Sequence, residues 1–233
     1  MEKELFLIAD IGGYTRFLRE QEKSLSHAQV VVAKLLEALM DSAQPFQVEK
    51  LEGDAVFLHL SWTAGAKDPG LLAAVRRMRG DFTLKQSGML AARTCDCDSC
   101  SQMHKLTVKF VAHAGEAARQ KVGPYSELAG MAVIVVHRML KNTVPVREYL
   151  LGTANVLPLI DATPPAARLD QDFEGIGPTP AYYLDLSGGI APLKPEIPKA
   201  PLLKRIIARV VLELRAMVFR LGLAIPPILK NIN

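Results

Sequence analysis

Two short extended runs, each ending in an aspartate, constrain this chain most strongly. Residues 5–11 read Leu-Phe-Leu-Ile-Ala-Asp-Ile, and residues 48–58 carry a second acid in Gly53-Asp54 between two further extended runs. Gly-Asp between such runs is a hairpin signal, so Asp10 and Asp54 are expected where neighbouring strands end. Two adjacent carboxylates repel each other unless a cation lies between them, and all-oxygen ligation favours magnesium or manganese together with substrate phosphates. A divalent phosphate-handling site is one interpretation, and an ordinary solvated turn is the other.

The residues around both acids carry a resemblance to a known family. Residues 9–15, Ala-Asp-Ile-Gly-Gly-Tyr-Thr, are similar to the Phe-x-Asp-Ile-x-x-Phe-Thr motif of class III nucleotidyl cyclases, and residues 50–54 resemble their Lys-x-x-Gly-Asp motif. Residues 109–116 are similar to the family's basic-x-Gly-Ile-His-x-Gly-Glu strand, and residues 127–139 resemble its Asp-x-x-Gly…Ala-x-Arg-Leu segment. The four pieces occur in order within residues 4–187, and they indicate a diverged, bacterial-type branch of the cyclases.

The resemblance implies a two-metal site and a base-reading pair. Asp10 and Asp54, with the Ile11 carbonyl, match the ligands of two Mg²⁺ or Mn²⁺ ions that polarise the α-phosphate and activate the ribose 3′-hydroxyl. Lys50 and Glu127 fall at the base-reading positions, where a lysine donates to an adenine ring nitrogen and a carboxylate accepts from the exocyclic amine. The pair therefore favours ATP over GTP as the substrate.

A helix arginine completes the expected catalytic set, but two departures from the family pattern weigh against turnover. Arg138 matches the arginine that stabilises charge developing on the α-phosphate. Ile134 stands where the family usually has a ribose-positioning asparagine, and residues 174–177, Glu-Gly-Ile-Gly, lack the lysine that often contacts the triphosphate. Losing one such donor costs roughly 3 to 4 kcal/mol of transition-state stabilisation. A catalytically weak or inactive nucleotide-binding module of the same fold is therefore the alternative to an active cyclase.

The resemblance also implies a homodimer. In the family, the metal-binding aspartates of one chain work with the base-reading residues and the arginine of its partner, so a single chain holds two incomplete half-sites.

The order of expected elements predicts an α/β fold, an α+β sandwich with a mixed sheet and helices on one face. Strands are expected at 4–10, 105–114, 148–152 and 181–186, with a hairpin across 52–54; helices are expected at 25–43, 69–80 and 130–141. The resemblance specifies this fold as the ferredoxin-like βαββαβ cyclase core with a mainly antiparallel sheet. Residues 162–180 are rich in proline and glycine and are expected to form a loop.

The chain divides into one principal domain and a C-terminal appendage. Its 233 residues, 49% of them hydrophobic, are enough to bury one full core. We assign residues 1–187 to the cyclase-like domain, with a cysteine-rich insertion at 92–104. Residues 188–201 form a Pro/Gly linker and residues 202–233 a basic amphipathic helix.

All three cysteines lie in the insertion, as Cys95, Cys97 and Cys100, and His104 follows closely. Three thiolates and one imidazole would complete a tetrahedral structural zinc site. The alternative is an exposed loop with redox-sensitive thiols, and in neither case would the insertion do the chemistry.

The C-terminal helix carries a wide apolar face beside a basic stripe. Charged residues such as Arg209 and Glu213 lie in its centre, so it is not expected to cross a membrane. Its apolar face must instead be covered by protein, either its own domain or a partner, or by a membrane surface.

Charge and composition bear on the partners and the compartment. The net charge is +4, yet residues 201–233 hold six basic residues against one acid, so the main domain is close to neutral. Aromatic residues make up 6% of the chain and offer no base-stacking platform, so nucleic acid is not an expected partner. Charged residues at positions 2–4 lead straight into a strand without a signal peptide. We therefore expect a cytoplasmic protein, with peripheral membrane association through the C-terminal helix as the alternative.

Overall fold

The computed structural model describes residues 2–19, 25–62, 68–92, 102–160 and 165–187, together with single positions between 203 and 221. The cysteines, and the linker expected at 188–201, lie outside the described residues.

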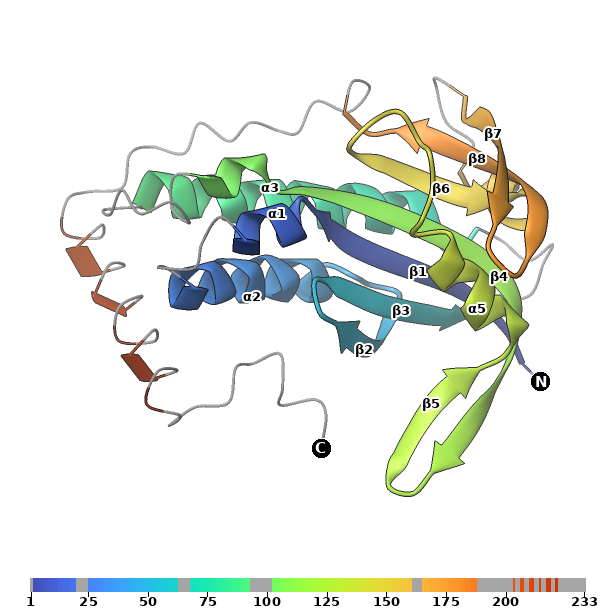
Figure 1. Ribbon diagram of the computed structural model, residues 1–233, viewed down its shortest axis with the longest axis horizontal. Helices are drawn as coiled ribbons and strands as arrows, with labels where there is room; N and C mark the ends of the chain where they lie inside the picture. The colour runs from blue at the N-terminus through green and yellow to red at the C-terminus, as the bar shows by residue number, and fades with distance from the viewer. Residues whose placement is uncertain are drawn as a thin grey trace.

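The described chain is built on one eight-stranded mixed sheet in the order β2-β3-β1-β4-β6-β8-β7, with β5 paired to the far end of β4 (Figure 1). The strands are β1 (Glu2–Gly12), β2 (Gln47–Glu52), β3 (Ala55–Ser61), β4 (Thr107–Val122), β5 (Tyr125–Ala129), β6 (Tyr149–Thr153), β7 (Ala167–Phe173) and β8 (Gly177–Asp185). The β4–β6 pair is parallel, and the other strand pairs are antiparallel. The expected mixed, mainly antiparallel sheet is therefore confirmed.

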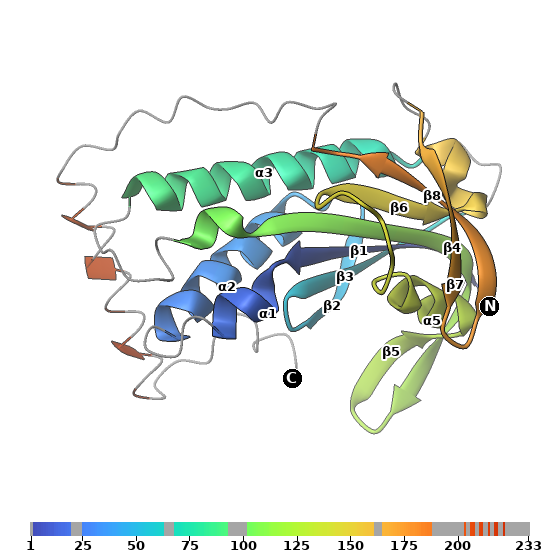
Figure 2. The same ribbon diagram turned by 45° about the horizontal axis from the view of Figure 1, so that its top comes forward.

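Helices cover both faces of this sheet, not one face as expected. The helices are α1 (Tyr14–Arg19), α2 (Leu25–Asp41), α3 (Leu71–Ala92) and α5 (Met131–Arg138), with short 3₁₀ turns η2 (Met103–Lys105) and η3 (Ala154–Leu159). Alternate β1 residues point to opposite faces: Leu5 and Leu7 pack in the core with α2 and α3, whereas Phe6 and Ile8 pack in the core with α5. Figure 2 shows α3 and α5 on opposite sides of the sheet.

A glycine lets α5 lie close to the sheet. A Cβ atom at Gly115 of β4 would lie 2.7 Å from the Cβ of Ala132, so only glycine fits between the strand and the helix. The apolar residues of α5, including Val135 and Val136, complete the core on that face. The eight-residue helix was expected, but its side of the sheet depends on this long-range contact.

The prediction of a loop at 162–180 is wrong, because β7 and the first residues of β8 form a hairpin there. Gly175 occupies the turn at a φ of 76°, which favours glycine. Pro178 and Pro180 lie beyond the part of β8 that pairs with β6, where a missing N–H costs no hydrogen bond on that side. The prolines and glycines that suggested a loop therefore belong to the turn and to a partly unpaired strand.

The described positions of the C-terminal segment are helical between 203 and 218, as expected. Except for Val218, which is partly buried, their large apolar side chains are exposed by 46% or more, with Leu203 and Leu221 above 60%. Within the described ranges, no helix has both the length and the apolar character needed to cross a bilayer.

Candidate functional site

The β1–β3 pairing brings Asp10 and Asp54 to the same end of the sheet. Asp10 is paired with Ala55, and the Ile11 N–H donates a hydrogen bond of 3.0 Å to the Asp54 carbonyl oxygen. The two side chains lie close enough to interact: burial and then the Asp10 carboxylate raise the pKa of Asp54 to about 6. The sequence placed both acids at strand ends, and the structure brings them together there.

A lysine lies beside this carboxylate pair. The β1–β4 register sets Lys109 opposite Asp10, and its Nζ lies 2.9 Å from Asp10 Oδ2. Burial lowers the pKa of Lys109, but the hydrogen bond and charge of Asp10 outweigh burial and raise that pKa overall. The sequence motif includes this basic residue without assigning it a role. Its place on the strand beside β1 is the signal that identifies it as a counter-ion.

The oxygen donors of this site fit a hard divalent cation. Asp54 carries a half-buried carboxylate beside a second one, and one ammonium group cannot balance both charges. No cluster of three or more His, Cys, Asp or Glu side chains able to hold a metal occurs among the described residues. A metal ion at this place would find the Asp10 and Asp54 carboxylates and a main-chain oxygen, an incomplete set of the kind that substrate phosphates complete for magnesium.

The two base-reading candidates also meet within one chain. Lys50 of β2 donates a 2.9 Å hydrogen bond to Glu127 of β5, and Lys50 Nζ lies 3.3 Å from Glu52 Oε1. His137 of α5 contacts both Glu52 carboxylate oxygens through Nε2, at 3.0 Å for Oε1 and 2.9 Å for Oε2. This contact raises the pKa of His137 despite burial, and it lowers the pKa of Glu52 despite burial. The sequence alone does not single out Glu52 or His137, although Glu52 shares a strand face with Lys50.

A buried charged cluster holds β5 in place against β2. Glu49 accepts hydrogen bonds from Arg119 and from the Leu128 N–H at 3.0 to 3.1 Å. His59, 7% exposed, lies between Glu49 and the buried carboxylate of Glu4, at 3.4 and 3.2 Å. Because Leu128 follows Glu127, these contacts fix the strand that carries Glu127.

Within a single chain, the guanidinium of Arg138 pairs with Glu174 and makes no ion pair with Asp10 or Asp54. Its Nη1 lies 3.0 Å from Glu174 Oε2, in the turn between β7 and β8, and Lys141 Nζ lies 3.8 Å from the same oxygen. That turn supplies an acid where the cyclase pattern often has a lysine. Ile134, one turn before Arg138, is 48% exposed and presents no side-chain hydrogen bond.

The remaining predicted ligands form no described site. His104 lies exposed on η2, and the three cysteines proposed to join it at a zinc site are outside the described residues.

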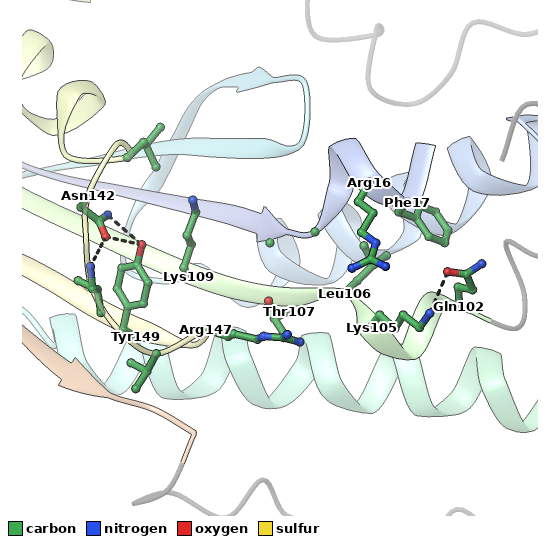
Figure 3. A pocket seen from close by; sticks show the side chains of 15 residues that line it. Arg16, Phe17, Gln102, Lys105, Leu106, Thr107, Lys109, Asn142, Arg147 and Tyr149 are labelled. Atoms are coloured by element: carbon green, nitrogen blue, oxygen red, sulfur yellow. Dashed lines mark hydrogen bonds between the residues drawn. The ribbon is translucent and has the colours of Figure 1, made fainter. Parts of the chain in front are cut away.

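A cavity of about 670 Å³ opens next to the carboxylate pair, lined by Gly12, Gly13, Lys109 and Tyr149 among others (Figure 3). The candidate site therefore has three parts: the carboxylate pair of Asp10 and Asp54, the Lys50–Glu127 pair, and this cavity.

Solved structures with the same fold are nucleotidyl cyclases. The chain aligns with a bacterial light-regulated adenylyl cyclase at a TM-score of 0.58 and 17% identity, covering 78% of this chain and 51% of the other, so it spans about half of that protein. It aligns with the adenylyl cyclase CyaB from P. aeruginosa at a TM-score of 0.57 and 16% identity, covering 82% of this chain and 97% of the other. The guanylate cyclase domain of RhGC from Catenaria anguillulae, solved in complex with GTP, gives a TM-score of 0.55 at 14% identity, covering 79% and 96%. These likenesses establish a cyclase-like fold.

Sequence comparison identifies the family. An uncharacterized protein of Mycobacterium tuberculosis (strain ATCC 25618 / H37Rv), Rv2561/Rv2562, is 41% identical over 194 residues, which cover 82% of this chain and 89% of the relative. A family model described as "Protein of unknown function (DUF2652)" matches residues 32–149. The chain therefore belongs to the DUF2652 family, and its fold is that of a nucleotidyl cyclase domain.

Proposed function

We propose that this protein is a nucleotidyl cyclase that converts ATP into a 3′,5′-cyclic nucleotide and pyrophosphate at a homodimer interface. The observation that carries the proposal is the meeting of Asp10 and Asp54 at one end of the sheet, where the pKa of Asp54 is raised to about 6. On a cyclase-like fold, such a carboxylate pair is suited to divalent cations and the phosphates they bind.

When bound there, two Mg²⁺ or Mn²⁺ ions would polarise the α-phosphate and favour ionisation of the ribose 3′-hydroxyl. The Asp10 and Asp54 carboxylates and the Ile11 carbonyl would hold them. Lys109 neutralises part of the carboxylate charge in their absence.

The other residues act on the base and the phosphates. Lys50 donates toward a ring nitrogen of adenine, and Glu127 accepts from its exocyclic amine; their mutual hydrogen bond aligns the two groups before the nucleotide arrives. Arg138 of the partner chain would stabilise charge that develops on the α-phosphate, a role that suits a permanently charged, planar donor fork.

Two observations favour a second candidate, a nucleotide-binding module with little or no turnover. Arg138 is held by Glu174, and Ile134 cannot position a ribose. A protein with these features would still bind a nucleotide through its acids and Lys50, but its transition state would lack two contacts.

A turnover assay with ATP and GTP, in Mg²⁺ and in Mn²⁺, separates the two candidates. We expect cyclic nucleotide from ATP that depends on the divalent ion, and its loss in Asp10→Ala and Asp54→Ala. Asp172→Ala is the matched control, because Asp172 is an exposed acid on β7. Divalent-dependent ATP binding without any product would favour the binding module, and neither binding nor product would contradict both.

A further inference from the structure

The cavity next to Asp10 and Asp54 is lined by segments that are far apart in the sequence. It has a volume of about 670 Å³ and lies between the end of β1, the start of β4 with η2, and the loop that follows α5. Figure 3 shows Arg16 and Arg147 reaching into it from different walls, toward the stretch of β4 that carries Thr107.

Four cationic side chains line this cavity, and no carboxylate is among its described lining residues. The cations are Arg16 of α1, Lys105 of η2, Lys109 of β4 and Arg147 of the loop after α5. Lys109 is partly balanced by Asp10, and Lys105 donates to the neutral Gln102 amide at 3.1 Å. Arg147 is exposed and makes no ion pair with any other described residue.

This concentration of positive charge indicates an anionic ligand. Cations that share one cavity repel each other, and a bound polyanion relieves that repulsion. Guanidinium groups match phosphate oxygens through two parallel hydrogen bonds, so Arg16 and Arg147 suit phosphate better than a point charge would. The cavity adjoins the end of β1 that carries Asp10, where the α-phosphate of a nucleotide would lie under the proposed function.

We propose that Arg16, Lys105 and Arg147 bind the terminal phosphates of the nucleoside triphosphate and hold the pyrophosphate that leaves. The inference rests on the proposed function for the identity of the ligand, but the polyphosphate site stands on the cavity alone. It assigns to the chain's own cations the contact that the Glu-Gly-Ile-Gly turn at 174–177 does not provide.

The site can be tested without turnover by titrating the full chain with inorganic tripolyphosphate in a calorimeter. We expect Arg147→Gln and Arg16→Gln each to weaken binding roughly tenfold or more, since each removes a charge-assisted hydrogen bond. Arg147→Lys should retain part of the affinity. Arg168→Gln is the control, because Arg168 is an exposed arginine on β7 that pairs with Asp170 outside the cavity.

Folding and specificity are checked in the same preparations. Arg16 and Arg147 are both exposed, so their variants should unfold at the wild-type temperature. Orthophosphate should bind much more weakly than tripolyphosphate, and equal affinity for the two would overturn a polyphosphate site. Unchanged tripolyphosphate binding in both glutamine variants would also overturn it.

Failure of the polyphosphate site and failure of the proposed cyclase activity give different experimental results. A wild-type protein that forms no cyclic nucleotide, yet binds tripolyphosphate in an Arg147-dependent way, would retain the site and refute the cyclase. Turnover of ATP with an unchanged KM and unchanged pyrophosphate inhibition in both variants would retain the cyclase and refute the site.

Discussion

At the scale of single residues, the site is a set of charges whose balance changes when a ligand arrives. Asp54 is half-buried beside Asp10, and Lys109 supplies one positive charge to the pair. A second negative charge is therefore left uncompensated in the metal-free protein at neutral pH. This stored repulsion should be measurable as a loss of stability.

We expect Asp54→Asn to raise the free energy of unfolding of the metal-free protein by about 1 to 2 kcal/mol at pH 7.5, after allowance for solvent screening of a half-buried group. The pKa of Asp54 is about 6 in the folded chain, above its ordinary value of 3.8. The folded state therefore holds its proton more tightly, and the contribution of Asp54 to wild-type stability falls as the pH rises from about 4 to about 6.

Denaturant unfolding in EDTA measures this effect, and addition of Mg²⁺ should stabilise the wild type more than Asp54→Asn. Asp172→Asn should change neither result. A variant less stable than the wild type at pH 7.5 would contradict the stored repulsion.

A second residue-scale prediction concerns Arg138, whose guanidinium is held by Glu174. If this ion pair competes with the α-phosphate, Glu174→Gln should raise turnover by up to about fivefold, because an exposed pair is worth about 1 kcal/mol at most. Glu37→Gln on α2 is the control. Steady-state rates measure the difference, and a fall in turnover would mean that Glu174 positions Arg138 instead of restraining it.

At the scale of elements, β4 carries much of the site's organisation. It places Lys109 against Asp10 and packs His113 against Thr153, with a distance of 2.8 Å from Nδ1 to Oγ1. Burial lowers the pKa of His113 to about 4, so this histidine is neutral in the folded strand at physiological pH.

This burial makes the strand sensitive to acid. Between pH 6.5 and about 4 the unfolded chain takes up a proton at His113 that the folded chain does not, so the contribution of His113 to stability falls as the pH is lowered, opposite to that of Asp54. The loss attributable to His113 should reach roughly 3 kcal/mol at the lower end. In urea unfolding, His113→Gln should gain stability relative to the wild type as the pH is lowered across this range, whereas His27→Gln on α2 should not. An identical pH dependence in His113→Gln and wild type would assign the acid sensitivity to other groups.

The elements also show what the sequence could and could not predict. The strand with Asp10, the hairpin with Asp54 and the helix with Arg138 follow from periodicity and turn residues, which are local properties. The strand β7 was missed because its polar, exposed residues gain their order from pairing with β8. The position of α5 on the second face was also missed, because it depends on the close approach at Gly115.

The site divides in the same way. Asp10 and Asp54 could be named because each lies in a short motif. Lys109, Glu52 and His137 could not be assigned roles, because each has a partner 85 or more positions away. The Lys109–Asp10 contact is set by strand register, and the Glu52–His137 contact by the packing of α5 on the sheet. The basic cavity was missed for a related reason, since its four cations come from four segments.

At the scale of the whole molecule, the central question is whether the site is shared between two chains. Under the proposed function, the Asp10–Asp54 pair of one chain meets Lys50, Glu127 and Arg138 of its partner. Within one chain, Arg138 bonds to Glu174 and not to the carboxylate pair, which is compatible with a role in a partner's site.

Mixing two inactive variants tests this arrangement. Asp54→Ala and Arg138→Ala should each be inactive alone, and a mixture that exchanges subunits should recover up to about a quarter of the wild-type activity, because half of the dimers would carry one intact site. Subunit exchange is verified with differently tagged chains, and a mixture of Asp54→Ala with Asp10→Ala is the control that should stay inactive. Full activity in a strictly monomeric preparation would contradict the shared site.

Because β4 is long, it would physically connect the two shared sites of a dimer. The strand is 16 residues long, roughly 50 Å, and it runs from Lys109 near one end into the hairpin that carries Glu127 at the other. In a two-fold dimer the two ends of β4 would therefore contact different nucleotides. The Lys109 end would lie near the phosphates of one nucleotide, and the Glu127 end near the base of the other. A shift of this strand when the first nucleotide binds would be transmitted along its hydrogen-bonded length, so the two reaction centres would respond to each other as a coupled pair.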